Sequence, residues 1–450
     1  MQARTVTGAG TLSPTPVLTP APNSDPRFGV VDAYRAPRDA SAIGARWERN
    51  AFWWKALQPN GPRSWNFFAT DRDHQINSEL RAGRKIVGEL INTPDWAAVN
   101  PREHGASVPK GLYLPFNDPR NYWGHFVSLI AKRYAGRIDQ WIIWNEVSIP
   151  SGQWHTWDGT RADYAQLVKV AYLAATAANP RAQIILAGDP YWYDRGAWFA
   201  DLLRRLTQDP QARSHHDYFD VVNLHLYNSA TQLVPVIASY RRMLARFGLH
   251  RPIWLAETNA VPYNDPVRRY PRANFYASLD DQASFIIQTY AIALSMGAQR
   301  IEVNRLTDGA DFIAGGVPLG LVRNNGTVRP AFYAYRTVST LFSHVMGGSL
   351  TVQPASGVYT VTLQRPDALI TVTWDQHPVA ATTTIAATGA GATLYDKFGQ
   401  SRTLSAVAGR YRLPLAPATD NSDAANPQDY VVGGSPLILV QPRAQQRTGG

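Results

Sequence analysis

The sequence contains no cysteine. This excludes disulfides, thiolate nucleophiles and cysteine-ligated metal centres. It also has no apolar run near the roughly 18 to 20 residues that a membrane-spanning helix requires. With 45% hydrophobic and 17% charged residues, the chain is not disordered as a whole, and 450 residues suffice for a large core. We therefore expect a folded protein without a transmembrane segment.

Several cofactor and nucleic-acid motifs are also missing. No Gly-x-Gly-x-x-Gly or P-loop pattern follows an apolar run, and no pair of histidines has the spacing of a zinc site. The net charge of +10 favours anionic partners, but no helix-turn-helix, zinc-finger or RNA-recognition pattern accompanies it. The arginines are dispersed, as on a solvated surface. We predict no metal, no organic cofactor and no nucleic-acid partner.

Residues 1–26 include the Thr/Pro-rich stretch TLSPTPVLTPAPNSDP. Such a composition predicts an extended, poorly packed linker. A chain that starts after removal of an export signal would show this pattern, so we expect a secreted or cell-surface protein.

Between residues 27 and 347, short β-rich runs alternate with longer helical patterns. The eight predicted strands cover residues 28–32, 45–52, 85–91, 138–144, 184–188, 221–225, 253–257 and 301–305. The predicted helices cover residues 71–82, 121–134, 162–178, 197–206, 234–247, 280–296 and 331–345. This alternation and size predict an α/β fold, a (β/α)8 barrel with its active site at the carboxyl ends of the strands. An open doubly wound sheet is the alternative, but eight successive units fit closure better.

Residues 348–445 have a different sequence pattern. Runs such as VYTVTLQ, ALITVTW and RYRLPL alternate apolar and polar residues and are separated by turn-forming clusters. They predict a C-terminal antiparallel β-sandwich. No pair of carboxylates stands at its strand ends, so a packing or spacing role is favoured over sugar binding.

Two of the predicted barrel strands end in a carboxylate. The stretch QWIIWNEVSIP places Asn145 and Glu146 after an apolar run, and PIWLAE places Glu257 three strand-helix units later. In an eight-stranded barrel, the fourth and seventh strands face each other across the mouth. Two carboxylates so placed suit cleavage of a glycosidic bond, where one donates a proton and the other attacks the anomeric carbon.

The ordered set of residues resembles the retaining glycoside hydrolase clan that is built on (β/α)8 barrels. WERNAFWW at 47–54, NTPDWA at 92–97 and HLY at 225–227 bring the chain closest to family 39, with family 5 second. Family 39 includes β-xylosidases, α-L-iduronidases and bacterial exopolysaccharide hydrolases. The resemblance covers about residues 27–346. It implies hydrolysis of a polysaccharide or oligosaccharide by double displacement, through a covalent glycosyl-enzyme intermediate.

The resemblance also implies roles for individual residues. Glu146 matches the general acid/base and Glu257 the nucleophile, while Asn145 matches the amide that holds the sugar 2-hydroxyl. Arg49 would keep Glu257 ionised by charge pairing. The two residues expected to donate hydrogen bonds around the same carboxylate are His225 and Tyr227.

One departure from the clan concerns the sugar platform. Many members have a tryptophan at the end of strand eight, whereas this chain has IEVNRLTDG at 301–309. Arg305 could instead meet a carboxylate on an anionic substrate, or it could form an ion pair with Asp308. Loop tryptophans could stack on sugar faces. The candidates are Trp96, Trp154, Trp157 and Trp192, of which Trp154 and Trp157 are preferred.

Two alternatives share this reading of the fold. The barrel could bind carbohydrate without catalysis, or the same site could transfer the glycosyl group to another sugar instead of water. The intact pair of carboxylates argues against the first alternative.

Overall fold

The structure, a computed structural model, describes residues 25–68, 72–150, 152, 155–267, 269–270, 276–309, 317–389, 391–419 and 430–443. Of the predicted linker, only Asp25 and Pro26 fall within these ranges, and Trp154 lies outside the described residues. Asp25 is already part of the folded body, because it is buried and its carboxylate accepts a hydrogen bond of 2.9 Å from the backbone N–H of His344. Within the described ranges, no helix has both the length and the apolarity needed to cross a bilayer.

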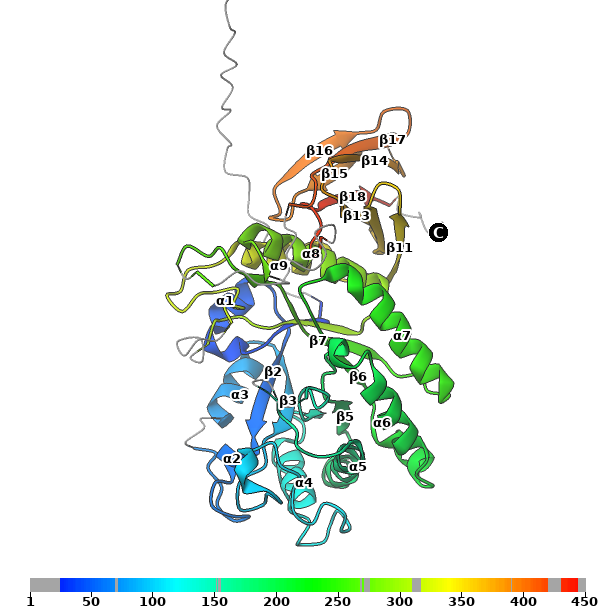
Figure 1. Cartoon of the computed structure of the whole chain (residues 1–450). Coiled ribbons are helices and arrows are strands. Elements are labelled where there is room, and N and C mark those ends of the chain that lie inside the picture. Colours follow the sequence, from blue (N-terminus) through cyan, green and yellow to red (C-terminus); the bar gives the residue numbers. More distant parts are fainter. Residues whose placement is uncertain are drawn as a thin grey trace, which may run out of the picture.

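Eight parallel strands form one sheet in the order β5-β4-β3-β2-β1-β10-β7-β6. Parallel bridges from Ile185 to Val221 and from Asp189 to Leu224 join the two outer strands. The sheet is thus a nearly closed barrel, and it confirms the predicted fold (Figure 1). The barrel strands are β1 (Phe28–Val30), β2 (Trp47–Trp53), β3 (Lys85–Ile91), β4 (Gln140–Ile143), β5 (Gln183–Leu186), β6 (Val222–Tyr227), β7 (Ile253–Asn259) and β10 (Arg300–Val303).

Helices surround this barrel, and several begin at residues that cap them. Thr160 and Ser278 each form a capping box, with Asp163 and Asp281 respectively, at the starts of α5 and α8. The predicted helices lie within a few residues of the observed ones, but α1 and α2 were not predicted because each is a short segment without a clear period. The helices are α1 (Pro37–Ala42), α2 (Trp54–Leu57), α3 (Arg72–Arg81), α4 (Tyr122–Tyr134), α5 (Arg161–Ala178), α6 (Ala197–Thr207), α7 (Leu233–Arg246), α8 (Leu279–Ser295) and α9 (Pro330–Leu341).

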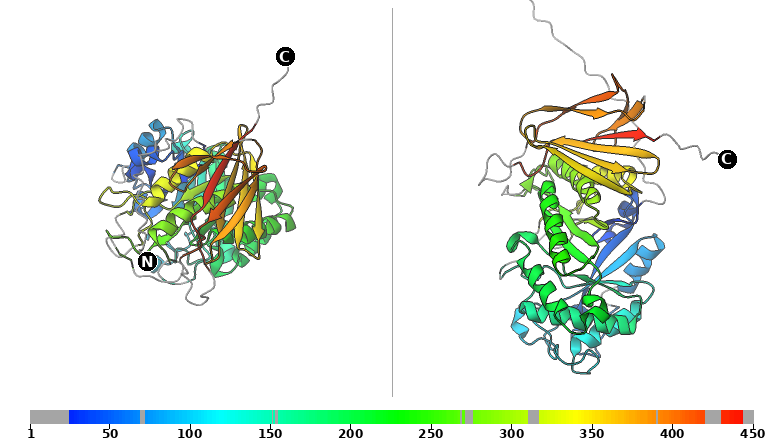
Figure 2. Two further views of the ribbon diagram at one scale, coloured as in Figure 1. Left: turned by 90° about the horizontal axis from the view of Figure 1, so that it is seen from above. Right: turned by 90° about the vertical axis from the view of Figure 1, so that its right-hand side faces the viewer.

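The C-terminal strands form antiparallel sheets that pack against α8 (Figure 2). One sheet has the order β11-β12-β13-β18-β15-β16, and β14 pairs with β17, which is consistent with the predicted β-sandwich. A further short pair, β8 (Val261–Pro262) and β9 (Tyr276–Ala277), follows β7. The C-terminal strands are β11 (Gly347–Gln353), β12 (Val358–Gln364), β13 (Ala368–Asp375), β14 (Ala381–Ala386), β15 (Gly391–Tyr395), β16 (Ser401–Ser405), β17 (Arg410–Leu415) and β18 (Leu437–Pro442).

Buried polar contacts join the C-terminal sheets to α8. The Lys397 ammonium, 3% exposed, donates to the hydroxyls of Ser284 and Ser435 at 2.9 and 2.7 Å. The Gln288 amide donates to the carbonyls of Gly433 and Gly434, both at 3.0 Å. These bonds fix the segment next to Val431, a residue that lines the cavity at the barrel mouth.

Side chains inside the barrel form layers of different character. The lower layer is apolar and includes Trp47, Val87 and Trp254. Because strand residues two apart point the same way, the next inward positions on β2 and β3 belong to Arg49 and Glu89. The layer nearest the carboxyl ends is therefore charged, although it is buried. This layer supports the candidate site.

Candidate active site

Glu146 stands on a sharp turn directly after β4. Trp144 and Glu146 both have left-handed backbone conformations, with φ of 70° and 43°. The buried Trp144 indole donates to the carbonyl of Thr156 at 2.7 Å, and the Thr156 hydroxyl donates to the carbonyl of Asn145. Non-glycine residues adopt this conformation only where the surroundings hold them. The turn thus directs the Glu146 carboxylate out of the strand and over the barrel mouth.

A β-bulge in β7 sets the direction of Glu257. Leu224 of β6 lies opposite Leu255, but the next residue, His225, lies opposite Glu257. The extra residue, Ala256, moves the carboxylate to a position beside the imidazole. Bulges next to active sites commonly redirect a side chain in this way.

Three donors surround the Glu257 carboxylate. The Arg49 guanidinium donates to Oε1, and the Tyr227 hydroxyl donates to Oε2. The Asn304 side-chain amide donates to the same Oε2 at 3.0 Å. Burial acts to raise the pKa of Glu257, but Arg49, His225 and the Tyr227 hydrogen bond outweigh it and lower the pKa to about 2. Glu257 is therefore an anion over the whole neutral range.

Arg49 lies in a cage of carboxylates. Its guanidinium donates to Glu89 at 3.0 Å as well as to Glu257, and its backbone N–H donates to Glu302 at 2.9 Å. Burial would lower the pKa of Arg49, but these anionic neighbours raise it well above its usual value. Burial in turn raises the pKa of Glu302 well above its ordinary range. Glu89 thus pairs with a barrel arginine beneath the cavity.

His225 connects the two candidate catalytic carboxylates. Its Nδ1 lies 2.8 Å from an oxygen of Glu146 and 3.6 Å from an oxygen of Glu257, and its side chain is fully buried. Burial acts to lower the pKa of His225, but the charge of Glu257 and the contact with Glu146 raise it. The imidazole thus holds Glu146 at a fixed place beside Glu257.

The two carboxylates open into one cavity of about 760 Å³ at the carboxyl ends of the strands. The ligand atoms of Glu146, His225 and Glu257 all lie within 4.8 Å of one another. The described residues that line the cavity are Asn145, Glu146, Ile149, Pro190, Trp192, Tyr193, His225, Tyr227, Asn228, Ser229, Gln232, Glu257, Val261, Asn304, Val317, Leu319 and Val431. This volume lies within the range of about 300 to 1,000 Å³ that is typical of small-molecule binding sites.

Seven of the predicted site residues gather at this cavity. Six line it: Asn145, Glu146, Trp192, His225, Tyr227 and Glu257. The side-chain oxygen of Asn145 is buried without a partner in the described structure. The seventh residue, Arg49, lies beneath the cavity and reaches it through Glu257.

Two predicted sugar-stacking tryptophans do not line the cavity. Trp157 is 2% exposed and packs edge-on against Trp144 in the core, so it has no free face to offer a sugar. Trp96 packs against Trp54, and its indole N–H donates to the carbonyl of Gln58 at 2.7 Å. For both residues the expectation was wrong, because sequence position after a strand does not show which way a loop folds.

Arg305 also differs from expectation. It does not line the cavity, and its guanidinium pairs with Asp32 at 2.5 Å, not with Asp308. Asp308 instead pairs with the buried Arg329 at 2.7 Å. Arg305 is thus engaged in a structural ion pair with a residue near the first barrel strand.

Sequence reasoning missed two residues of the site, Asn304 and Tyr193. Asn304 contacts the Glu257 carboxylate, whereas the site residue predicted at the end of strand eight was Arg305. Its position one residue beyond β10 was the available signal. Trp192 and Tyr193, 48% and 50% exposed, form the aromatic part of the wall after β5. Trp192 was one of the loop tryptophans considered, whereas Tyr193 was not.

Glu146, His225 and Glu257 have the ligand types and the spacing that could hold a metal ion. An ion there would have to compete with the Arg49 guanidinium and the Tyr227 hydroxyl, which already donate to Glu257. It would also replace the contact between His225 and Glu146. The present hydrogen bonds suit proton transfer and nucleophilic attack by the carboxylates themselves.

No protein-family model and no curated protein matches the chain. Solved structures do. A family 39 glycoside hydrolase from Bacteroides cellulosilyticus WH2 aligns with a TM-score of 0.69 at 14% identity, over 93% of this chain and 81% of that one. A family 30 endoxylanase from Clostridium papyrosolvens C71 gives 0.59 at 13% identity, over 94% and 98%. A monomeric β-xylosidase from Caulobacter crescentus CB15 gives 0.58 at 15%, over 95% and 98%. At these identities the likeness establishes a shared fold, a barrel with its C-terminal sheets.

Proposed function

We propose that the protein is a retaining glycoside hydrolase that acts on an oligosaccharide or polysaccharide. The observation that carries this proposal is the pair Glu146 and Glu257, with oxygens within 4.8 Å of each other and unequal surroundings. Retaining enzymes hold their carboxyl groups about 5 to 5.5 Å apart, whereas inverting enzymes need about 6.5 to 9.5 Å to admit a water. The likeness to solved glycoside hydrolases supports the same function.

In the first step, the ionised Glu257 attacks the anomeric carbon and forms a new carbon–oxygen bond. The glycosidic bond breaks, its electron pair goes to the leaving oxygen, and that oxygen takes a proton from Glu146. The donors around Glu257 keep it ionised for attack, while His225 holds the proton donor at 2.8 Å. Asn145 lines the same cavity, where its side-chain amide would contact a sugar hydroxyl.

In the second step, the Glu146 carboxylate removes a proton from a water molecule. The water oxygen then bonds to the anomeric carbon, and the electron pair of the ester bond returns to Glu257. Two displacements at one carbon restore the original configuration. Every proton and electron pair is thus exchanged between the substrate, water and the two carboxylates.

We further propose that the cleaved sugar unit is uncharged, against the anionic substrate that the net charge and Arg305 suggested. Among the described residues of the cavity wall there is no lysine or arginine, and Arg305 is paired elsewhere. A substrate carboxylate about 5 Å from ionised Glu257 would meet a repulsion of about 3 kcal/mol at an effective dielectric constant near 20. Aliphatic side chains form much of the wall: Ile149, Val261, Val317, Leu319 and Val431.

The test is hydrolysis of a panel of polysaccharides and nitrophenyl glycosides by the wild-type chain and by Glu257→Gln. The panel includes matched pairs that differ in one group, such as a glucoside and the corresponding glucuronide. We expect turnover of at least one neutral substrate, loss of more than about 1000-fold in the variant, and a preference of about 100-fold for the neutral partner. Glu103→Gln, a glutamate outside the cavity wall, is the matched control.

Product stereochemistry tests the mechanism. Proton NMR should show the product first in the configuration of the substrate. Azide should restore turnover to Glu146→Ala with a glycosyl azide of retained configuration, and to Glu257→Ala with one of inverted configuration. Binding of oligosaccharides without release of sugar across the panel would favour the non-catalytic alternative, and an inverted first product would refute retention.

A further inference from the structure

Asn304 lies at the carboxyl end of the last barrel strand, on a rigid piece of backbone. Its N–H donates to the carbonyl of Thr258 at 3.2 Å, and its own carbonyl accepts from the Asn259 side chain at 2.9 Å. The Asn259 amide also donates to the carbonyl of Leu319 at 2.7 Å. Asn304 is thus held to β7 at two points, and the same Asn259 amide joins β7 to the segment that forms the cavity wall.

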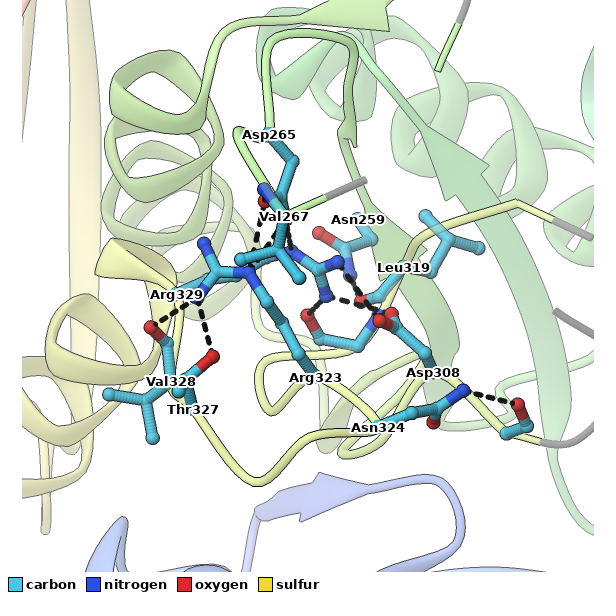
Figure 3. A network of polar contacts seen from close by, with 12 residues as sticks. Asn259, Asp265, Val267, Asp308, Leu319, Arg323, Asn324, Thr327, Val328 and Arg329 are labelled. Atoms are coloured by element: carbon cyan, nitrogen blue, oxygen red, sulfur yellow. Dashed lines mark hydrogen bonds and ion pairs between the residues drawn. The ribbon is translucent and has the colours of Figure 1, made fainter. Parts of the chain in front are cut away.

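A buried ion network fixes that segment in turn. The Arg329 guanidinium, 0% exposed, pairs with Asp308 and Asp265, both at 2.7 Å (Figure 3). Asp265 also pairs with Arg323 at 2.8 Å. Figure 3 shows Asn259 beside this network, with its amide directed to Leu319. The support around Asn304 therefore extends from the loop after β7 to the start of α9.

The side-chain amide of Asn304 forms hydrogen bonds with the nucleophile and with the Tyr227 hydroxyl. Its Nδ2 donates to the Tyr227 hydroxyl oxygen at 2.7 Å and to Glu257 Oε2 at 3.0 Å. The Tyr227 hydroxyl also donates to Oε2, so the two acceptors lie side by side and share one N–H of the amide. Asn304 thus acts on the charge of Glu257, directly and through the Tyr227 hydroxyl.

We propose that Asn304 is a catalytic residue for the second displacement, in which the glycosyl ester is hydrolysed. This inference rests on the proposed function. When Glu257 attacks, its negative charge is lost as the ester bond forms. A hydrogen-bond donor to the carboxylate therefore stabilises the reactant more than the transition state. When the ester breaks, the electron pair returns to Glu257 and the charge reappears. A donor held at Oε2 then stabilises the transition state more than the ester.

The experiment compares Asn304→Ala with wild type on a neutral dinitrophenyl glycoside, whose good leaving group makes the first displacement fast. We expect kcat to fall about 10- to 100-fold, the range for loss of one hydrogen bond to a charged group. We expect kcat/KM, which reports the first displacement, to change less than about 3-fold. Rapid mixing should show a burst of dinitrophenol, and mass spectrometry should detect the glycosylated protein at steady state.

Asn324→Ala is the matched control, because the Asn324 amide is exposed and bonds only the carbonyl of Gly309 among its described contacts. It should keep the wild-type kcat, the wild-type burst and the wild-type level of glycosylated protein. If Asn304→Ala does not fold, Asn304→Leu keeps a similar size and removes the donor without adding a charge, and the same burst is expected. Tyr227→Phe, which removes the other donor to Oε2, should slow the same step.

An equal fall of kcat and kcat/KM without accumulation of ester would overturn the proposal, because a merely structural loss affects both displacements. Unchanged kinetics would overturn it as well. In either case the proposed function would stand, since it is tested by Glu257→Gln and by product configuration. Loss of turnover in the wild-type protein across all substrates would instead refute the function.

Discussion

Replacing Gly188 with alanine tests how the two carboxylates are held. Gly188 follows β5, and a Cβ built there would lie 1.9 Å from His225 Nε2 and 2.2 Å from Cδ2. Its backbone is not left-handed, so only space is at issue. Ordinary contact begins at 3.4 Å, and the imidazole would have to move by about 1.5 Å. The added carbon would press on the face of the ring at Nε2, so we expect the imidazole to shift and its 2.8 Å contact with Glu146 to be lost.

We expect Gly188→Ala to lower the free energy of unfolding by about 1 to 3 kcal/mol, the usual cost of overpacking a core. The effect on activity should be larger, because displacement of a catalytic group by about 1 Å can cost about 100-fold. That loss should be greatest on substrates with poor leaving groups, which depend on protonation by Glu146. Substrates with good leaving groups should lose less.

The assay combines urea unfolding with kcat/KM on a series of aryl glycosides of decreasing leaving-group acidity. Gly347→Ala is the control, because a Cβ there would meet nothing within 4 Å. A Gly188→Ala protein with wild-type kinetics and stability would refute the view that His225 positions Glu146. A uniform loss on all leaving groups would show that the imidazole does not act through proton donation.

Three further predictions concern buried charges. Arg49→Met should cost about 3 to 5 kcal/mol in urea unfolding. The lowered pKa of Glu257 stabilises the fold above a pH of about 4, and this contribution is lost as the pH falls toward 2. The difference in unfolding free energy between wild type and Arg49→Met should therefore narrow in acid. A difference that stays constant with pH would contradict this prediction. Arg329→Met should lower the free energy of unfolding by a similar amount. It should also raise KM, because the segment that carries Leu319 in the cavity wall loses its support. Urea unfolding and initial rates measure these two effects. Lys397→Met removes a buried contact between the C-terminal sheets and α8, so calorimetry should show separate unfolding transitions for the barrel and for those sheets. A single sharp transition would contradict this prediction.

The barrel and the catalytic pair could be predicted from local patterns. Apolar runs that end on Glu146 and Glu257 are typical of buried strands with a polar carboxyl end, and eight alternating strand-helix units strongly favour a closed barrel. The loops could not be predicted in the same way. Trp157 follows Glu146 closely in sequence but turns into the core, because its indole packs on Trp144 and Tyr164. Burial of a loop aromatic depends on distant neighbours, which periodicity does not report.

The sequence by itself determined the order of strands and helices and the carboxylates at the ends of the fourth and seventh strands, because periodicity and strand-end chemistry are local properties. Only the tertiary structure decided that Asn304 faces the nucleophile, that Arg305 pairs with Asp32, and that Val431 of the C-terminal region reaches the cavity. These contacts join residues far apart in the chain. Their geometry depends on a bulge, on turns with left-handed residues and on the docking of two sheets, and none of these is set by spacing alone.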